Sequence, residues 1–247
     1  MNFINPPKKS PKNMIHRTFR SNLLGCEVGY NIYLPPDYKK SGKNYPVKYH
    51  LHGWKENEST GIWALEKTYD SKTIVVFANS CDDGYIGGEL PIESMIITEL
   101  LPHIDAQYRT ETREKRLISG FSMGGAGAFY YAVKYPELFG SMTAYAGTYH
   151  HFYHKGSRTV DVPVEKAAEI YAEMLEKQWD TEKDGILYMV KQNAEALRRM
   201  TSITLHVGTA DVLLCDNEIL HLHLNALDIP HEYKIFDGIG HELAKII

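Results

Sequence analysis

The chain has 247 residues, 43% of them hydrophobic, with 27 Lys and Arg against 31 Asp and Glu and a formal net charge of −4. A chain of this size and composition can bury a globular core without disulfides or structural metals. The acidic balance argues against nucleic acid as the main partner, because phosphate binding needs a basic surface. A membrane partner is not expected either, since no apolar run approaches the roughly 18 residues of a membrane span.

The N-terminus and the cysteines indicate the compartment. Residues 1–20 are polar, contain Pro6, Pro7 and Pro11, and lack the apolar stretch of a signal peptide. Three widely spaced cysteines form neither a disulfide framework nor a zinc site; they are Cys26, Cys81 and Cys215. We therefore expect an irregular lead-in and a reducing, cytoplasmic compartment.

Strand-like and helical segments alternate along the rest of the chain. Strands are expected at residues 28–34, 47–51, 74–78, 117–121, 141–146, 203–207 and 232–236. Helical periodicity marks residues 90–108, 124–133 and 217–227. This alternation predicts an α/β fold, with a mostly parallel central sheet covered by helices on both faces, in a single domain over residues 1–247.

One segment breaks the alternation. Residues 149–199 have a helical pattern and no strand, and fifty residues are long for a connection between two strands. We interpret this segment as a helical cap, inserted before the strand at residues 203–207.

Residues 117–127 carry the strongest chemical signal. They contain the pattern Gly-x-Ser-x-Gly at Gly120, Ser122 and Gly124, between an apolar strand and a helix rich in Ala and Gly. This context is typical of a nucleophile elbow, where a sharp turn strains the serine backbone and the flanking glycines relieve the crowding. The Ser122 hydroxyl would stand at the carboxyl end of the sheet, and the Met123 amide would point at a forming oxyanion.

A serine nucleophile needs a base and an acid, which in this kind of fold follow it in the order acid, then histidine. His241 follows the last strand in a loop with two glycines that can carry it back over the sheet, whereas His206 lies within a strand and is expected to be packed. Asp211 directly follows a strand and is preferred as the acid. Asp216 falls where the next helix should start and is interpreted as its N-cap.

The second oxyanion donor should come from the loop after an early strand. His52, Gly53 and Trp54 follow the strand at residues 47–51. We expect the Trp54 amide to be the donor, with Gly53 allowing the close approach of the substrate.

Two histidines on that strand, His50 and His52, share one face and could form a metal-binding pair. The sequence offers no third ligand beside them, so we interpret both as structural. Neither a metal nor a cofactor is expected.

Aromatic residues occur at two further places. Tyr149, Phe152 and Tyr153 open the helical insertion, and Tyr85 lies in a Gly-rich stretch after the strand at residues 74–78. Each set has two interpretations. The first three form a partly exposed loop or a wall that contacts a sugar or a phenolic acyl group, and Tyr85 belongs to a turn or lines the pocket.

Several segments together resemble one enzyme family. They are residues 120–125, 135–139, 33–38, 46–53 and 99–105. As a set they resemble the esterase D group of α/β-hydrolases, which includes feruloyl esterases, acetylxylan esterases and S-formylglutathione hydrolase. The resemblance runs from about residue 28 to 147 and resumes from 203 to 241.

The resemblance implies an α/β-hydrolase fold with Ser122, Asp211 and His241 as catalytic triad and the Trp54 and Met123 amides as oxyanion donors. It also implies a serine esterase without a cofactor. Its substrates would be short acyl or hydroxycinnamoyl (acetyl or feruloyl) esters, such as those of plant-polysaccharide fragments. The insertion matches no part of the family and is expected to shape the substrate pocket.

Two other functions remain open at this point. A thioesterase or an acyltransferase, similar to S-formylglutathione hydrolase, could use the same fold and the same triad. A non-catalytic carbohydrate-binding module would instead predict a broken triad, whereas all three triad members can be placed in this sequence. The expected partner is a small-molecule or oligosaccharide ester, and the oligomeric state stays undecided.

Overall fold

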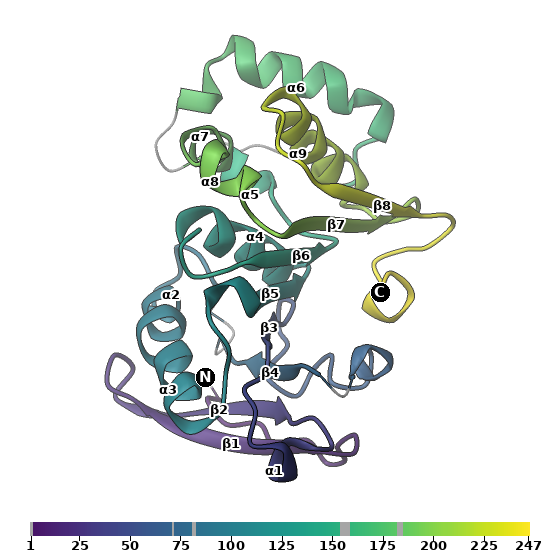
Figure 1. The fold of residues 1–247 in the computed structure, drawn as a ribbon. Helices are drawn as coiled ribbons and strands as arrows, with labels where there is room; N and C mark the ends of the chain where they lie inside the picture. The colour runs from purple at the N-terminus through teal and green to yellow at the C-terminus, as the bar shows by residue number, and fades with distance from the viewer. Residues whose placement is uncertain (1, 71, 81–82, 154–158, 182–184) are drawn as a thin grey trace.

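A computed structural model describes residues 2–70, 72–80, 83–153, 159–181 and 185–247, and the side chains of residues 151 and 152 are outside this description. Its strands are β1 Met14–Ser21, β2 Cys26–Tyr33, β3 Val47–Leu51, β4 Ile74–Ala78, β5 Arg116–Phe121, β6 Ser141–Tyr145, β7 Ser202–Gly208 and β8 Glu232–Phe236. They form one eight-stranded sheet in the order β1-β2-β4-β3-β5-β6-β7-β8 (Figure 1).

The sheet is parallel except at one edge, where β2 runs antiparallel to both β1 and β4. From β4 through β8 every neighbouring pair is parallel. Strands covered on both faces are apolar along their length, and all five residues of β4 are buried. The predicted α/β architecture is confirmed.

The helices are α1 Tyr38–Ser41, α2 Ile92–Ser94, α3 Leu101–Gln107, α4 Met123–Lys134, α5 His150–Tyr153, α6 Ala167–Glu176, α7 Ile186–Gln192, α8 Ala194–Arg198 and α9 Leu214–Ala226. Single 3₁₀ turns lie at Glu66–Thr68, Arg113–Lys115, Val164–Lys166, Trp179–Thr181 and Leu243–Lys245. In Figure 1 α2 and α3 lie to the left of the sheet and the C-terminal turn lies to the right, so both faces are covered. Within the described residues, no helix has the length and apolar character that crossing a membrane requires.

A π-helical stretch, Met95–Leu100, joins α2 to α3 into one helical segment. Pro102 follows it in the first turn of α3. Proline has no amide hydrogen and its ring crowds the preceding turn, which accounts for the local widening of the helix. The helix expected at residues 90–108 is therefore present with a local distortion just before its proline.

The irregular lead-in expected for residues 1–20 is wrong from Met14 onward. There the chain forms β1, which pairs with β2 along its whole length. Met14, Phe19 and Ser21 are buried, whereas Arg17 and Arg20 are exposed and interrupt the apolar residues. Charged side chains are typical of an edge strand, and they hide it from a search for apolar runs.

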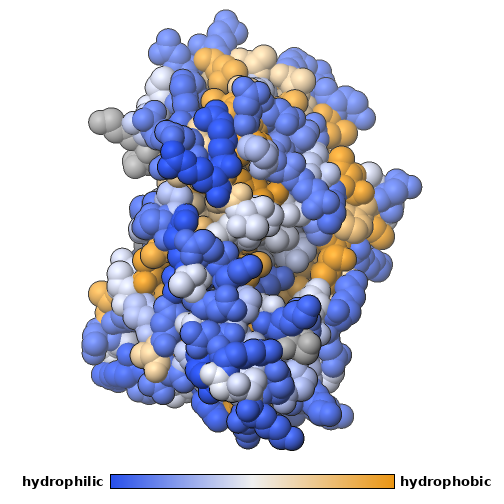
Figure 2. Space-filling view, in the orientation of Figure 1, coloured by the Kyte–Doolittle hydropathy of each residue, from blue (hydrophilic) through white to orange (hydrophobic). Residues whose placement is uncertain are grey.

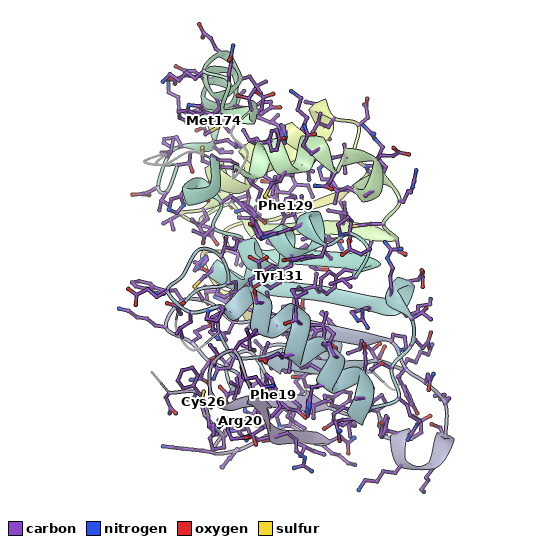
Figure 3. All side chains as sticks on the ribbon, turned by 90° about the vertical axis from the view of Figure 1, so that its left-hand side faces the viewer. Phe19, Arg20, Cys26, Phe129, Tyr131 and Met174 are labelled. Carbon is purple, nitrogen blue, oxygen red and sulfur yellow. The ribbon has the colours of Figure 1, made fainter. Side chains whose placement is uncertain are left out.

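Small residues bring α4 close to the sheet. A Cβ atom on Gly124 would lie 2.1 Å from the carbonyl oxygen of Leu51, the last residue of β3. Larger side chains further along α4 fill the interior, including Phe129 and Tyr131, which are almost fully buried (Figure 3). This close packing sets the position of the α4 N-terminus relative to the ends of β3 and β5.

The described part of residues 149–199 contains helices α5 to α8 and no strand. Its longest helix, α6, packs against α9 through buried Met174, and α7 contacts α4 and α9. Figure 2 shows a mostly hydrophilic surface on this face of the molecule, with hydrophobic residues gathered mainly in the upper half, where these helices lie. The insertion thus extends the helical layer, and its action as a cap over a pocket stays a prediction.

Candidate active site

Ser122 occupies the turn between β5 and α4, with φ 56° and ψ −118°. A non-glycine residue adopts such a conformation only where the surroundings compel it. The Ser122 amide donates a hydrogen bond to the Tyr145 carbonyl (2.9 Å), which ties the turn to β6. A Cβ on Gly120 would lie 2.0 Å from the Gly124 carbonyl oxygen, so this turn requires glycine there.

Asp211 and His241 form a hydrogen-bonded pair at the same end of the sheet. The Nδ1 atom of His241 lies 2.9 Å from Oδ2 of Asp211, whose other oxygen accepts the Leu213 amide (2.9 Å). The Asp211 side chain is fully buried, whereas 33% of the His241 side chain is exposed. A buried carboxylate fixed in this way keeps the hydrogen of the imidazole on Nδ1 and leaves Nε2 to act as a base.

Two contacts bring the His241 loop to the nucleophile turn. The imidazole stacks on the ring of Phe121, the residue before Ser122, with ring centroids 4.5 Å apart. The loop after β8 passes directly over the end of β7, since the Ala210 amide donates to the Ile239 carbonyl (3.0 Å). Because β5, β7 and β8 are parallel, the residues that follow them meet at one edge of the sheet.

A cavity of about 360 Å³ opens beside Ser122, and its described lining consists of Trp54, Ser122, Met123 and Thr148. Met123 is the first residue of α4, where backbone amides have no partner within the helix. Thr148 was missed by sequence reasoning. Its amide donates to the Ser122 carbonyl (3.2 Å), a contact across the sheet edge that no local pattern reveals.

A family model described as "Putative esterase" matches residues 21–241, most of the chain. The chain belongs to this esterase family. A strained serine, a hydrogen-bonded Asp–His pair and a cavity are parts that a serine esterase requires.

Curated relatives of this esterase match about half of it. An esterase of Mycobacterium tuberculosis is 34% identical over 145 residues, which are 52% of this chain and 31% of that protein. An endo-1,4-beta-xylanase/feruloyl esterase of Xylanibacter ruminicola is 33% identical over 149 residues, 52% of this chain and 20% of that protein. The match thus spans less than a third of either relative's length.

Solved structures share the fold over nearly the whole chain. A ferulic acid esterase superposes with a TM-score of 0.72 at 22% identity, covering 94% of this esterase and 92% of that chain. An S-formylglutathione hydrolase from Staphylococcus aureus has a TM-score of 0.71 at 16% identity, with the same coverage. At such identities the likeness establishes the α/β-hydrolase fold.

The amide of Gly53 is engaged within its own turn. It donates to Oε2 of Glu56 (2.6 Å), a residue that sequence reasoning did not single out. Gly53 is therefore occupied as a donor, while Trp54, the next residue, is 67% exposed at the cavity. This arrangement fits the expectation that Trp54, rather than Gly53, offers an amide to the substrate.

His50 of β3 and His52, which follows the strand, have structural surroundings. The Ser80 amide donates to Nε2 of His52 (3.1 Å), and Nδ1 of His52 donates to the Gly53 carbonyl (2.8 Å). His50 contacts the Ser119 hydroxyl, and burial holds its pKa well below the ordinary value. In the part of the chain that the structure describes, no three His, Cys, Asp or Glu side chains are grouped to hold a metal ion.

Of the two interpretations given for Tyr149 and Tyr153, neither the partly exposed loop nor the wall describes them, because both are fully buried in the core and outside the described cavity lining. Tyr85 is buried as well, and its phenol oxygen accepts the His52 amide (2.9 Å). These tyrosines pack rather than face the solvent, so the structure gives them no place to contact a substrate. The side chain of Phe152 lies outside the described residues.

The sequence suggested that Asp216 is the N-cap of the helix that follows it. This prediction is wrong. Helix α9 begins at Leu214, and Asp216 is buried within it. Its Oδ2 atom accepts the amides of Tyr149 (2.6 Å) and His150 (3.0 Å), while Oδ1 accepts the Thr159 hydroxyl (2.6 Å). The carboxylate therefore caps the start of α5, a partner 66 residues away that local spacing cannot reveal.

Proposed function

We propose that this serine esterase uses Ser122 as nucleophile, His241 as general base and Asp211 as the acid that orients the base. The observation that carries the proposal is the strained Ser122 turn, whose Phe121 ring stacks on His241, together with the hydrogen bond from His241 to the buried carboxylate of Asp211. Strain at such a turn lifts the hydroxyl out of the sheet, and the carboxylate sets the tautomer of the imidazole.

In the proposed reaction Oγ of Ser122 attacks the ester carbonyl carbon while Nε2 of His241 takes the hydroxyl proton. The Met123 and Trp54 amides donate hydrogen bonds to the oxyanion of the tetrahedral intermediate. The intermediate collapses to an acyl-enzyme as His241 returns the proton to the departing alcohol. Water then attacks the acyl group, with His241 again as base, and releases the acid and the free serine.

The substrates we propose are short acyl or hydroxycinnamoyl esters, such as acetyl or feruloyl groups on plant-polysaccharide fragments. Two names support this class: one relative is an endo-1,4-beta-xylanase/feruloyl esterase, and one structure of the same fold is a ferulic acid esterase. The 360 Å³ cavity is near the lower end of the range for small-molecule sites, which suits an acyl group of this size.

A thioester substrate is the second candidate, supported by the likeness to an S-formylglutathione hydrolase. The same three residues would act on it, with a thiol as the leaving group in place of an alcohol. The test is to measure kcat/KM for S-acyl glutathiones and for oxygen esters with the same acyl groups. The ratio of the two kcat/KM values decides which substrate class the enzyme prefers.

The test of the proposed triad is hydrolysis of p-nitrophenyl acetate, butyrate and ferulate by the wild type and by Ser122→Ala. We expect turnover by the wild type and a loss of at least about a thousandfold in kcat in the variant. Ser94→Ala is the matched control, since Ser94 is exposed on α2, outside the described cavity lining.

Labelling with a fluorophosphonate probe separates the remaining outcomes. Labelling at Ser122 without turnover means that the triad is active and the ester series is wrong. A folded wild type that is neither labelled nor active contradicts the proposal and favours a non-catalytic binding module.

A further inference from the structure

Trp54 is an exposed tryptophan at the mouth of the cavity beside Ser122. Two thirds of its surface (67%) is in contact with solvent, and it lines that cavity together with Met123 and Thr148. An indole is among the largest apolar surfaces that a side chain can offer, and at the wall of a cavity it can cover a flat apolar part of a ligand. The position of the indole therefore indicates a role beyond that of the Trp54 amide.

The backbone on both sides of Trp54 is held in a tight turn. Lys55 has φ 59°, in the left-handed region that non-glycine residues rarely adopt. The turn is closed on itself by the hydrogen bond from the Gly53 amide to the Glu56 carboxylate. Strained non-glycine residues persist where the surrounding contacts compel them, and they cluster at ligand-binding sites.

Lys55 also defines which face of the indole is open. Its Nζ atom stands 4.2 Å from the centroid of the Trp54 ring, a cation–π contact that covers one face. A planar ring can then stack only on the opposite face. The contact also restrains the indole before the substrate arrives, which lowers the entropy cost of stacking.

The other aromatic side chains near the site are not available for stacking on a substrate. Tyr85, Tyr149 and Tyr153 are buried, and Phe121 is covered by the imidazole of His241. Among the aromatic side chains whose surroundings the structure describes at this edge of the sheet, Trp54 is the one that a bound ester can reach.

We propose that the indole of Trp54 is the stacking platform for a planar aromatic ring of the ester, and so determines the preference of the enzyme for ring-bearing substrates. The inference rests on the proposed function and assigns a subsite to it. The ring can belong to the acyl group or to the alcohol, and both place a flat apolar surface against the indole.

The experiment compares kcat/KM for three esters: methyl cinnamate, with the ring on the acyl side, benzyl acetate, with the ring on the alcohol, and ethyl butyrate, which has no ring. Hydrolysis is followed in a pH-stat for the wild type, Trp54→Leu and Trp54→Phe. The readout is the ratio of kcat/KM for a ring-bearing ester to that for ethyl butyrate, because a ratio cancels any general loss through the backbone of the turn.

For Trp54→Leu we expect the ratio to fall about tenfold, mainly through KM, for whichever ring-bearing ester uses the platform. Trp54→Phe restores part of it, because a smaller ring still stacks. Trp63→Leu is the matched control and leaves the ratio at the wild-type value. Trp63 is 52% exposed and belongs to the same connection between β3 and β4, but it lines a separate groove with Pro7 and Lys8.

An unchanged ratio in Trp54→Leu, or an equal loss on all three esters, overturns the proposal. Failure of the proposed function looks different, because the wild type is then inactive on every ester and unlabelled by a fluorophosphonate. Calorimetric titration of Ser122→Ala with cinnamate and with benzyl alcohol gives a readout without turnover, and we expect the additional substitution Trp54→Leu to weaken the binding of whichever ligand uses the platform about tenfold. Equal affinity for both ligands with and without the indole also overturns the proposal.

Discussion

At the residue scale, Glu56 acts on the site through the backbone of the turn after β3. Its carboxylate accepts the Gly53 amide at 2.6 Å, three residues back along the chain. We propose that this bond holds the turn in the conformation in which the next amide, that of Trp54, serves the cavity that Trp54 lines with Met123. Glu56 is thus a positioning residue, in which the acceptor oxygen matters more than the charge.

We expect Glu56→Ala to lower kcat about tenfold on p-nitrophenyl acetate, since a misdirected oxyanion donor weakens transition-state binding. Glu56→Gln keeps an acceptor oxygen and should retain most of the activity. Steady-state kinetics of both variants, with thermal unfolding to verify folding, provide the measurement. Equal losses in Ala and Gln would show that the charge, rather than the hydrogen bond, is what the site uses.

At the element scale, α4 can pack closely on the sheet because Gly124 has no side chain. A Cβ on Gly124 would meet the Leu51 carbonyl oxygen at 2.1 Å and the His52 carbonyl oxygen at 2.5 Å. Neither is the end of a flexible side chain, so the helix or β3 would have to move. Gly124 thereby couples the position of the nucleophile turn to the strand that precedes the oxyanion loop.

Gly124→Ala should therefore lower the free energy of unfolding by about 2 to 4 kcal/mol and lower kcat as well. Denaturant unfolding measures the first effect, and ester hydrolysis measures the second. Gly240→Ala is the control, because a Cβ there has only the Ala210 carbonyl oxygen within reach, at 3.8 Å. A Gly124→Ala variant as stable as the wild type would contradict this account of the packing.

The insertion is tied to the rest of the molecule by Asp216. The carboxylate accepts hydrogen bonds from two backbone amides at the start of α5 and from the Thr159 hydroxyl.

We expect Asp216→Ala to speed hydrogen exchange at Tyr149 and His150 and to destabilise the fold by about 2 to 4 kcal/mol, because it leaves buried donors without an acceptor. Asp216→Asn keeps one acceptor oxygen and should have a smaller effect. Exchange rates that do not change in Asp216→Ala would refute this role.

At the scale of the whole molecule, buried neutral histidines connect stability to pH. Burial lowers the pKa of His50, His206 and His223 in the folded protein, whereas in the unfolded chain each titrates near its ordinary value of about 6.5. Below that value the unfolded chain binds more protons than the folded one. These histidines therefore make the fold less stable as the pH falls.

We expect the free energy of unfolding to fall between about pH 7.5 and about pH 5. Urea unfolding at the two ends of this range measures the change. His50→Asn should make the dependence shallower, because it removes a group whose pKa burial holds well below its ordinary value. A stability that is flat over the range would show that the three rings accept protons in the folded state as readily as in the unfolded chain.

Much of the fold follows from local patterns in the sequence. Strand β4 is a continuous apolar run, and the helical segment over residues 92–107 has buried apolar side chains with the helical period. Edge strand β1 was missed because Arg17 and Arg20 interrupt its apolar residues, and only pairing with β2 makes it a strand.

Some residues of the candidate site could be proposed from the sequence, and others were found only in the tertiary structure. Ser122, Asp211 and His241 could be proposed as a triad because each lies in the connection after a strand, and parallel strands bring such connections to one edge of the sheet. The roles of Glu56, Thr148 and Asp216 depend on backbone partners that local spacing does not specify. The sequence gives the positions of the tyrosines along the chain, but it does not say whether each side chain is buried or exposed. Only the packing of the tertiary structure buried Tyr85, Tyr149 and Tyr153 and left Trp54 exposed, because burial is decided by which surfaces meet and not by neighbours in the chain.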